Sequence, residues 1–331
     1  MTAPIARLAL AATLALGLLS TSAQALDLQG HRGARGLAPE NTLAAFATAL
    51  AVGVTTLELD VHLSADGVPM VSHDPALQAD LTRDARGQWL SAPGPLIRSL
   101  SRAQLQQDYQ LGRARPGSAV ARNFPGQQAA DGQRLPTLAE VLALMNQPGA
   151  GAVRANIEIK LNPGQPEETP EPEAIVRAVL ATLREAGALQ RVSLQGFNWR
   201  ALQIAQRLAP GLPTAYLSAQ RPSFDTISDG RWTAGFTLAT HGSLPAMVQA
   251  AGGTVWSPHF ADLSATLVAQ AHQRGLQVLP WTVNQPADMA RLIDWGVDGL
   301  ITDYPDRARS VMAERGLALP PALPTLPTLP R

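Results

Sequence analysis

The feature that most constrains the fold of this chain is a regular alternation of short β-rich runs with amphipathic helical stretches. Such alternation is typical of βαβ units built around a parallel sheet. The expected strands cover residues 26–31, 55–61, 153–160, 191–197, 214–218, 254–258, 277–283 and 298–302. The expected helices between them include residues 41–51, 137–145, 172–186, 199–208, 263–273 and 287–295. Eight repeats predict an α/β fold of the (β/α)₈ TIM-barrel type; a doubly wound open sheet is the alternative, because periodicity does not show whether a sheet closes.

Two segments interrupt this alternation. Residues 77–135 form a stretch rich in Gly, Pro, Gln and Arg that is too long for an ordinary connection, which predicts an inserted subdomain or lid between the second strand and the second helix. Residues 316–331 are Pro-rich and of low complexity, and we expect a disordered tail there because such a composition does not build a core.

The N-terminus has the three parts of a secretory signal peptide. Arg7 precedes an apolar run over residues 8–19, and Ala23-Gln24-Ala25 supplies a small-x-small cleavage site. The run is too short to span a bilayer, and a buried N-terminal helix is the weaker alternative. We expect cleavage after Ala25, one domain over residues 26–315, an exported protein that is periplasmic or secreted, and no transmembrane segment after cleavage.

Charge and cysteine content narrow the classes of ligand and site. Lys and Arg together number 26, as do Asp and Glu, so the formal net charge is zero. Without a long basic run, the sequence does not favour binding to nucleic acid or to anionic lipid, and a small neutral or anionic substrate fits better. The absence of cysteine excludes disulfides, thiolate metal sites, cysteine nucleophiles and a lipid-modified N-terminal cysteine.

Carboxylates gather at the expected strand ends, where active sites of parallel barrels lie. In the second strand, the period of two places Glu58 and Asp60 on one face. In the third strand, Glu158 and Lys160 share a face in the same way. Like charges held this close repel unless a cation lies between them, so Glu58, Asp60 and Glu158 predict a site for Ca²⁺ or Mg²⁺.

Two histidines lie beside these carboxylates in the sequence. His31 ends the first strand and His73 follows the second, and imidazole can both give and take a proton near neutral pH, so we predict them to be a general acid and base. Arg32 and Lys160 are expected to neutralise charge on substrate oxygens. His62 has a weaker claim because it lies at the very end of its strand, and His259 could line the pocket.

A family resemblance rests on ordered motifs over nearly the whole chain after residue 25. The chain resembles the glycerophosphodiester phosphodiesterases through His31-Arg32-Gly33, Pro39-Glu40-Asn41-Thr42, Glu58-x-Asp60, Asp66-Gly67, His73-Asp74, Asn156-Ile157-Glu158-Ile159-Lys160, Trp281-Thr282-Val283-Asn284 and Asp298-Gly299-Leu300-Ile301-Thr302-Asp303-Tyr304-Pro305. The resemblance implies a TIM barrel with an insertion and hydrolysis of glycerophosphodiesters to glycerol 3-phosphate and an alcohol.

The resemblance also implies roles for single residues. It makes Glu58, Asp60 and Glu158 the metal ligands, His31 and His73 the acid-base pair, Arg32 and Lys160 the phosphate contacts, and Trp281 an apolar wall for the glycerol moiety. Glu40 is expected to hold His31 or a ligand-bound water, although it could simply complement a helix N-terminus. One divalent cation is implied, with Ca²⁺ favoured over Mg²⁺.

One position departs from the family pattern. Gly196-Phe197, preceded by Gln195, stands where the family usually has Ser-Phe, so a serine hydrogen bond is missing there. Two other functions remain open on the sequence. One is a phosphodiesterase of the lysophospholipase D type acting on lipid headgroups, and the other is a non-catalytic barrel that binds phosphodiesters.

Overall fold

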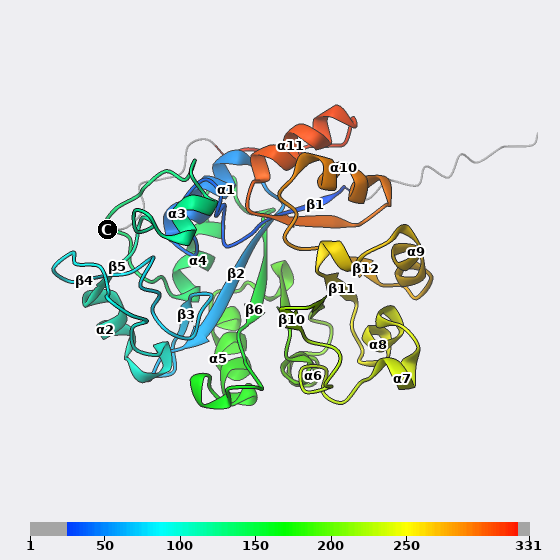
Figure 1. Cartoon of the computed structure of the whole chain (residues 1–331), viewed down its shortest axis with the longest axis horizontal. Helices are drawn as coiled ribbons and strands as arrows, with labels where there is room; N and C mark the ends of the chain where they lie inside the picture. The colour runs from blue at the N-terminus through cyan, green and yellow to red at the C-terminus, as the bar shows by residue number, and fades with distance from the viewer. Residues whose placement is uncertain (1–24, 324–331) are drawn as a thin grey trace, which may run out of the picture.

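The computed structural model describes residues 25–323 and contains a barrel of eight parallel strands with helices outside it (Figure 1). The expected signal peptide therefore lies outside the described residues, apart from Ala25. The barrel strands are β1 (Asp27–Gly30), β2 (Thr56–Leu63), β6 (Arg154–Ile159), β7 (Val192–Gly196), β8 (Thr214–Ser218), β11 (Val255–Pro258), β12 (Gln277–Val278) and β13 (Gly299–Thr302). The main outer helices are α1 (Leu43–Val52), α4 (Leu138–Met145), α5 (Pro172–Glu185), α6 (Trp199–Leu208), α8 (Leu244–Ala250), α9 (Ala265–Gln273), α10 (Pro286–Asp294) and α11 (Pro305–Glu314).

The sheet closes between β12 and β13. The strands pair in the order β12-β11-β8-β7-β6-β2-β1-β13. The Asp298 N–H donates to the Val278 carbonyl at 3.0 Å and the Ile301 N–H to the Pro280 carbonyl at 3.0 Å, which joins the two ends. The predicted (β/α)₈ barrel is confirmed, and the open sheet is excluded. The predicted strand 277–283 is shorter than expected because Pro280 has no N–H for the ladder.

Alternation along β2 separates the apolar core from the site. Leu57, Leu59 and Val61 belong to the large core cluster between sheet and helices, whereas Glu58 and Asp60 occupy the alternate positions. Each fully buried leucine contributes about 1.5–3 kcal/mol to this core. Within residues 25–323, no helix combines the length and the apolar character needed to cross a bilayer.

The insertion is a packed unit beside the barrel mouth. It is preceded by β3 (Pro69–Val71), an unexpected strand that pairs antiparallel with the end of β2. It contains β4 (Arg83–Asp84), α2 (Arg102–Gln107), β5 (Tyr109–Gln110) and α3 (Ala119–Asn123). Its own apolar cluster comprises Met70, Leu77, Ile97, Leu105 and Leu135. Figure 1 shows it to one side of the barrel in cyan and teal, next to β2. The segment predicted as a subdomain or lid is thus a small folded layer.

The described part of the Pro-rich segment packs against the barrel instead of hanging free. Leu317 and Leu323 contact the main core, and the Leu323 N–H donates to the Leu50 carbonyl at 2.9 Å. Arg309 donates to the carbonyls of Gly53 and Pro320. The expectation of disorder is therefore wrong for residues 316–323, because these leucines and carbonyls find partners on the barrel; residues 324–331 lie outside the described part.

Candidate active site

Strand register brings three carboxylates together at the mouth of the barrel. Asp60 of β2 lies opposite Glu158 of β6, and Glu58 lies two residues before Asp60 on the same face. Each of Glu58, Asp60 and Glu158 has a carboxylate oxygen within 4.8 Å of those of the other two, and all three side chains are buried. Three carboxylate oxygens at this separation are a donor set suited to Ca²⁺ or Mg²⁺.

The electrostatics of the cluster favour a bound cation. Burial, reinforced by the charge of Asp60, raises the pKa of Glu58 well above its usual value, and burial raises the pKa of Glu158 to about 7 despite the opposing charge of Lys160. Burial would also raise the pKa of Asp60, but Lys160 and the other nearby positive groups lower it instead. Asp60 Oδ1 is buried and accepts no hydrogen bond from the described residues. A buried carboxylate oxygen with no hydrogen bond, close to two carboxyl groups that resist ionisation, fits a divalent cation even with Lys160 Nζ 3.5 Å away.

His31 is held by a carboxylate that follows the last barrel strand. Its Nδ1 lies 2.6 Å from Asp303 Oδ1, and Asp303 Oδ2 accepts a hydrogen bond from Asn284 Nδ2 at 2.7 Å. Since a carboxylate only accepts, Nδ1 carries the proton and Nε2, 4.0 Å from Glu58 Oε2, is left without one. Burial lowers the pKa of His31 and Asp303 partly offsets this effect. His31 therefore presents an unprotonated Nε2 at neutral pH.

His73 follows β3 and lines the same cavity as His31. Its Nδ1 lies 3.1 Å from Asp74 Oδ1, and His62 Nε2 donates to its carbonyl at 3.2 Å. Burial, together with the charges of Arg32 and Lys160, lowers the pKa of His73 to about 4. His62 thus holds the backbone of His73 and does not itself line the cavity.

The cavity has a volume of about 120 Å³ and brings together most of the residues predicted from the sequence. Its lining includes His31, Arg32, Glu58, His73, Glu158, Gln195, Phe197 and Trp281. Trp281 stands edge-on to Phe197, with ring centroids 5.3 Å apart, and donates to the Ser257 carbonyl at 2.9 Å. His259 packs edge-on against Trp281 at 5.2 Å. One side of the cavity is therefore an aromatic wall.

Arg32 is fixed by a left-handed backbone and by two carboxylates. With φ at 50°, its N–H donates to Glu58 Oε2 at 2.8 Å, while Nη1 donates to Glu40 Oε1 at 2.6 Å. Strained backbone of this kind is concentrated at functional sites. Glu40 also pairs with Arg35 at 2.6 Å. Glu40 contacts the two arginines and does not hold His31, whose Nδ1 faces Asp303 instead. That Glu40 holds a ligand-bound water stays a prediction.

Lys160 contacts the carboxylates instead of lining the cavity. Its Nζ lies 2.9 Å from Glu158 Oε1 and 3.5 Å from Asp60 Oδ1. Burial alone would lower its pKa, but these two carboxylates raise it, so the side chain is charged at neutral pH. Its positive charge compensates the negative charge of Glu158 and Asp60, two of the three predicted metal ligands.

The sequence reasoning missed three polar residues of this site. Asp303 and Asn284 belong to two of the motifs above, and Gln195 precedes Gly196. Gln195 Nε2 donates to Glu58 Oε1 at 2.7 Å. Gln195 and Asp303 lie at the C-terminal ends of β7 and β13, where the strand-end argument applied to all eight strands would find them, whereas Asn284 lies in the loop six residues after β12.

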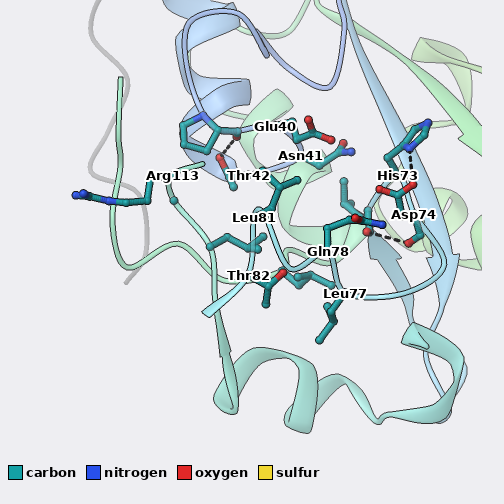
Figure 2. A pocket seen from close by; sticks show the side chains of 16 residues that line it. Glu40, Asn41, Thr42, His73, Asp74, Leu77, Gln78, Leu81, Thr82 and Arg113 are labelled. Carbon is teal, nitrogen blue, oxygen red and sulfur yellow. Dashed lines mark hydrogen bonds and ion pairs between the residues drawn. The ribbon is translucent and has the colours of Figure 1, made fainter. Parts of the chain in front are cut away.

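A second, narrower cleft lies between the insertion and the barrel, next to His73. Its volume is about 40 Å³, room for only a few water molecules. Figure 2 shows His73 and Asp74 at one end and Arg113 at the other. Between them lie Glu40, Asn41 and Thr42 from the loop before α1, and Leu77, Gln78, Leu81 and Thr82 from the insertion. The insertion therefore borders the catalytic cavity on the side of His73.

Comparison with known proteins gives one consistent result. The model of the glycerophosphoryl diester phosphodiesterase family matches residues 31–307. A glycerophosphodiester phosphodiesterase from Caldanaerobacter subterraneus is 28% identical over 290 residues, covering 86% of this chain and 97% of the relative. A solved structure of a candidate glycerophosphoryl diester phosphodiesterase from Silicibacter pomeroyi DSS-3 is 37% identical, with a TM-score of 0.79 over 89% of this chain and 95% of that one.

A more distant structure shares the fold. It is an Oleispira antarctica phosphodiesterase in complex with the product sn-glycerol-3-phosphate, 24% identical with a TM-score of 0.62, covering 87% of this chain and 97% of that one. The family match extends over most of the chain and includes every residue of the carboxylate cluster and both cavity histidines. The chain belongs to the glycerophosphoryl diester phosphodiesterase family.

Proposed function

We propose that this protein hydrolyses glycerophosphodiesters to sn-glycerol 3-phosphate and an alcohol, with His31 and His73 as general acid and base. The observation that carries the proposal is a cluster of three buried carboxylates, with oxygens within 4.8 Å of one another, two of which, Glu58 and Glu158, line the same cavity as both histidines. Family membership, and the glycerol phosphate product bound by the Oleispira relative, support the substrate class.

In this proposal the two histidines transfer protons, and the charged groups of the site stabilise the negative charge of the phosphate. His31, with its proton on Nδ1 and Asp303 behind it, is arranged to accept a proton at Nε2, and the Asp303 carboxylate then stabilises the imidazolium. His73 lines the same cavity and is placed to exchange the second proton that cleavage of a phosphodiester requires. The Arg32 guanidinium adds positive charge beside the phosphate position. Glu58, Asp60 and Glu158 would hold a divalent cation, which would supply further stabilisation of phosphoryl charge.

Two finer features belong to the same proposal. The oxygen donor set accepts either Ca²⁺ or Mg²⁺, and we favour Ca²⁺ because exported members of the resembled family commonly use it. The N-terminal pattern of Arg7, the apolar run 8–19 and Ala23-Gln24-Ala25 supports export to the periplasm or beyond. N-terminal sequencing of the protein recovered from the extracytoplasmic fraction tests the second feature, and a chain that begins at Met1 would contradict it.

A panel of glycerophosphodiesters, assayed with Ca²⁺, with Mg²⁺ and with a chelator, tests the activity. We expect release of sn-glycerol 3-phosphate that the chelator abolishes and the cation restores. His31→Ala and His73→Ala should each reduce turnover about 10²-fold or more, as expected for loss of a general acid or base. His272→Ala is a matched control, since His272 pairs with Asp298 on the outside of the barrel and is 39% exposed. Activity that survives both site substitutions would refute the assignment.

A second candidate function, lysophospholipase D activity on lipid headgroups, is favoured by one observation. Phe224 lies on the hairpin of β9 (Gln220–Arg221) and β10 (Phe224–Asp225) and is 39% exposed. The centroid of its ring lies 5.1 Å from that of Phe197 in the cavity wall. Phe224 and Phe197 together offer an apolar surface for the acyl chain of a lysophospholipid. If this surface holds the chain, Phe224→Ser should weaken hydrolysis of lysophospholipids while leaving glycerophosphodiester hydrolysis intact; equal effects on both substrates would remove this candidate. Phosphodiester binding without turnover would instead support the non-catalytic barrel.

A further inference from the structure

Inside the barrel, a connected set of buried amides links the carboxylate cluster to the opposite end of the sheet. Gln29, Asn156 and Gln195 are at most 2% exposed and come from β1, β6 and β7. We propose that Gln195 is a positioning residue for Glu58 and that the amide network below it sets its orientation. The inference rests on the proposed cation site, of which Glu58 is a ligand.

Asn156 stands at the centre of the network. Its Nδ2 has two hydrogens and donates both, one to Gln29 Oε1 and one to Gln195 Oε1, each at 2.9 Å. Its Oδ1 accepts from the Ser193 hydroxyl at 2.9 Å. Asn156 is completely buried, so leaving any of these groups without a partner would cost about 1–3 kcal/mol.

The two ends of the network are carboxylates, which determines the direction of every hydrogen bond. Gln29 Nε2 donates to Asp27 Oδ2 at 2.9 Å, and Gln195 Nε2 donates to Glu58 Oε1 at 2.7 Å. With the cation bound, Glu58 is ionised, and an ionised carboxylate only accepts, so each glutamine points its amide nitrogen outward and its oxygen towards Asn156. Asn156 can satisfy both oxygens only with its own nitrogen. No amide in the set can turn over without leaving two donors or two acceptors facing each other.

Glu58 is consequently held from two sides. Its Oε1 accepts from Gln195 and its Oε2 from the backbone N–H of Arg32 at 2.8 Å. These two hydrogen bonds favour the ionised form and prevent the carboxylate plane from rotating. Outer partners that orient ligands in this way change metal affinity 10–100-fold when removed. Gln195 therefore supplies a contact to the ligand set at the strand end where the usual serine is replaced by Gly196.

Two substitutions test the proposal by direct titration of Ca²⁺ and Mg²⁺ in a calorimeter. Gln195→Met removes the donor at nearly constant volume. Asn156→Asp replaces the central donor by an acceptor, so both glutamines must turn their nitrogens inward and Gln195 then faces Glu58 with its oxygen. We expect either change to raise the dissociation constant of the cation about 10-fold or more.

Gln206→Met is the matched control. Gln206 donates to Thr214 Oγ1 and to the Gly252 carbonyl, outside the catalytic cavity. It should leave cation binding unchanged. Thermal melting in the presence of a chelator distinguishes a structural role of Gln195 from a role in positioning Glu58. A purely structural role would lower the melting temperature of the cation-free protein and leave the dissociation constant of the cation unchanged. A dissociation constant for Gln195→Met within twofold of wild type overturns the proposal, even if Asn156→Asp fails to fold.

The lower half of the network has its own test. Gln29→Met breaks the link to Asp27 and leaves Asn156 and Gln195 in contact, so we expect a smaller, few-fold rise in the dissociation constant. An unchanged value would overturn the part of the proposal that extends to Asp27. If the wild-type protein binds neither cation, the proposed cation site itself fails, an outcome distinct from normal binding in all the variants.

Discussion

Replacing Asp303 by asparagine tests whether the carboxylate behind His31 contributes to catalysis. In the wild-type protein, Asp303 accepts from His31 Nδ1 at 2.6 Å and from Asn284 Nδ2 at 2.7 Å, so both of its oxygens face donors. An asparagine has only one oxygen to offer. It must either turn its NH₂ towards Asn284, placing two donors together, or turn it towards His31, which moves the ring proton to Nε2.

The size of the effect follows from the pKa of Asp303. Burial would raise this pKa, but the neighbouring His31 outweighs burial and holds it at about 2, below the ordinary 3.8. The lowering of this pKa from 3.8 to about 2 corresponds to about 2 kcal/mol, on the order of 10- to 100-fold in rate if the same interaction stabilises the imidazolium formed during the reaction. A shift to the wrong tautomer would add to this loss.

Steady-state kinetics with a saturating cation and a glycerophosphodiester measure the loss. We expect kcat of Asp303→Asn to fall by about 10-fold or more by the same reasoning, with the cation dissociation constant unchanged. Asp298→Asn is the matched control, because Asp298 makes a similar pair with His272 at 2.9 Å, on the outer surface of the barrel. A kcat for Asp303→Asn within threefold of wild type, in a folded protein, would show that Asp303 only supports the structure.

Three further predictions concern stability. The pKa of Asp303 is lower in the folded protein than in the unfolded chain, so its contribution to the unfolding free energy is complete above about pH 4 and is lost as the pH falls to about 2 and below. The difference in urea-unfolding free energy between wild type and Asp303→Asn should therefore shrink over that interval. A constant difference would contradict the reasoning. Gly33→Ala should lower the unfolding free energy by roughly 2–5 kcal/mol, because φ is +87° and a Cβ would lie 2.6 Å from the Ala45 carbonyl carbon. Gly67→Ala is the control: its Cβ would have no atom within 4 Å, so it should lower the unfolding free energy by only about 1–2 kcal/mol. Equal losses would exclude the close contact as the cause. A chain ending at Gly316 loses the packing of Leu317 and Leu323, so thermal unfolding should show a loss of roughly 2 kcal/mol with kcat unchanged, and an unaltered melting curve would show that this packing is not stabilising.

The barrel strands could be located from the sequence because they are long or strongly apolar and lie between helices with clear periodicity. The strand at 214–218 was placed at its observed ends. The insertion was recognised as an interruption, but its elements could not be placed, since β4 and β5 have two residues each and β3 has three. Elements this short carry no periodicity of their own, and they are defined by their partners: β3 pairs with β2, and β4 pairs with β5.

The candidate site divides in a similar way. The shared face of Glu58 and Asp60 is a local property of one strand, and only the register between β2 and β6 was needed to add Glu158. Asp303 lies 272 residues from the histidine it contacts, and Gln195 lies 137 residues from Glu58. Their positions at strand ends mark Asp303 and Gln195 as residues of the site, but the arrangement of the strands in the barrel decides which partners they contact, and no local pattern in the sequence indicates those partners.

The hairpin of β2 and β3 has a consequence for how such a protein can diversify. Val61 pairs with Val71, and the Ser72 N–H donates to the Asp60 carbonyl at 3.0 Å, so His73 is attached to the same ribbon that carries two of the carboxylates. The rest of the insertion leaves and returns beyond this ribbon. Its length and sequence can therefore drift over evolutionary time without changing the spacing of the reacting groups. The ribbon that fixes Glu58, Asp60 and His73 is in this way structurally independent of the length of the layer beside it.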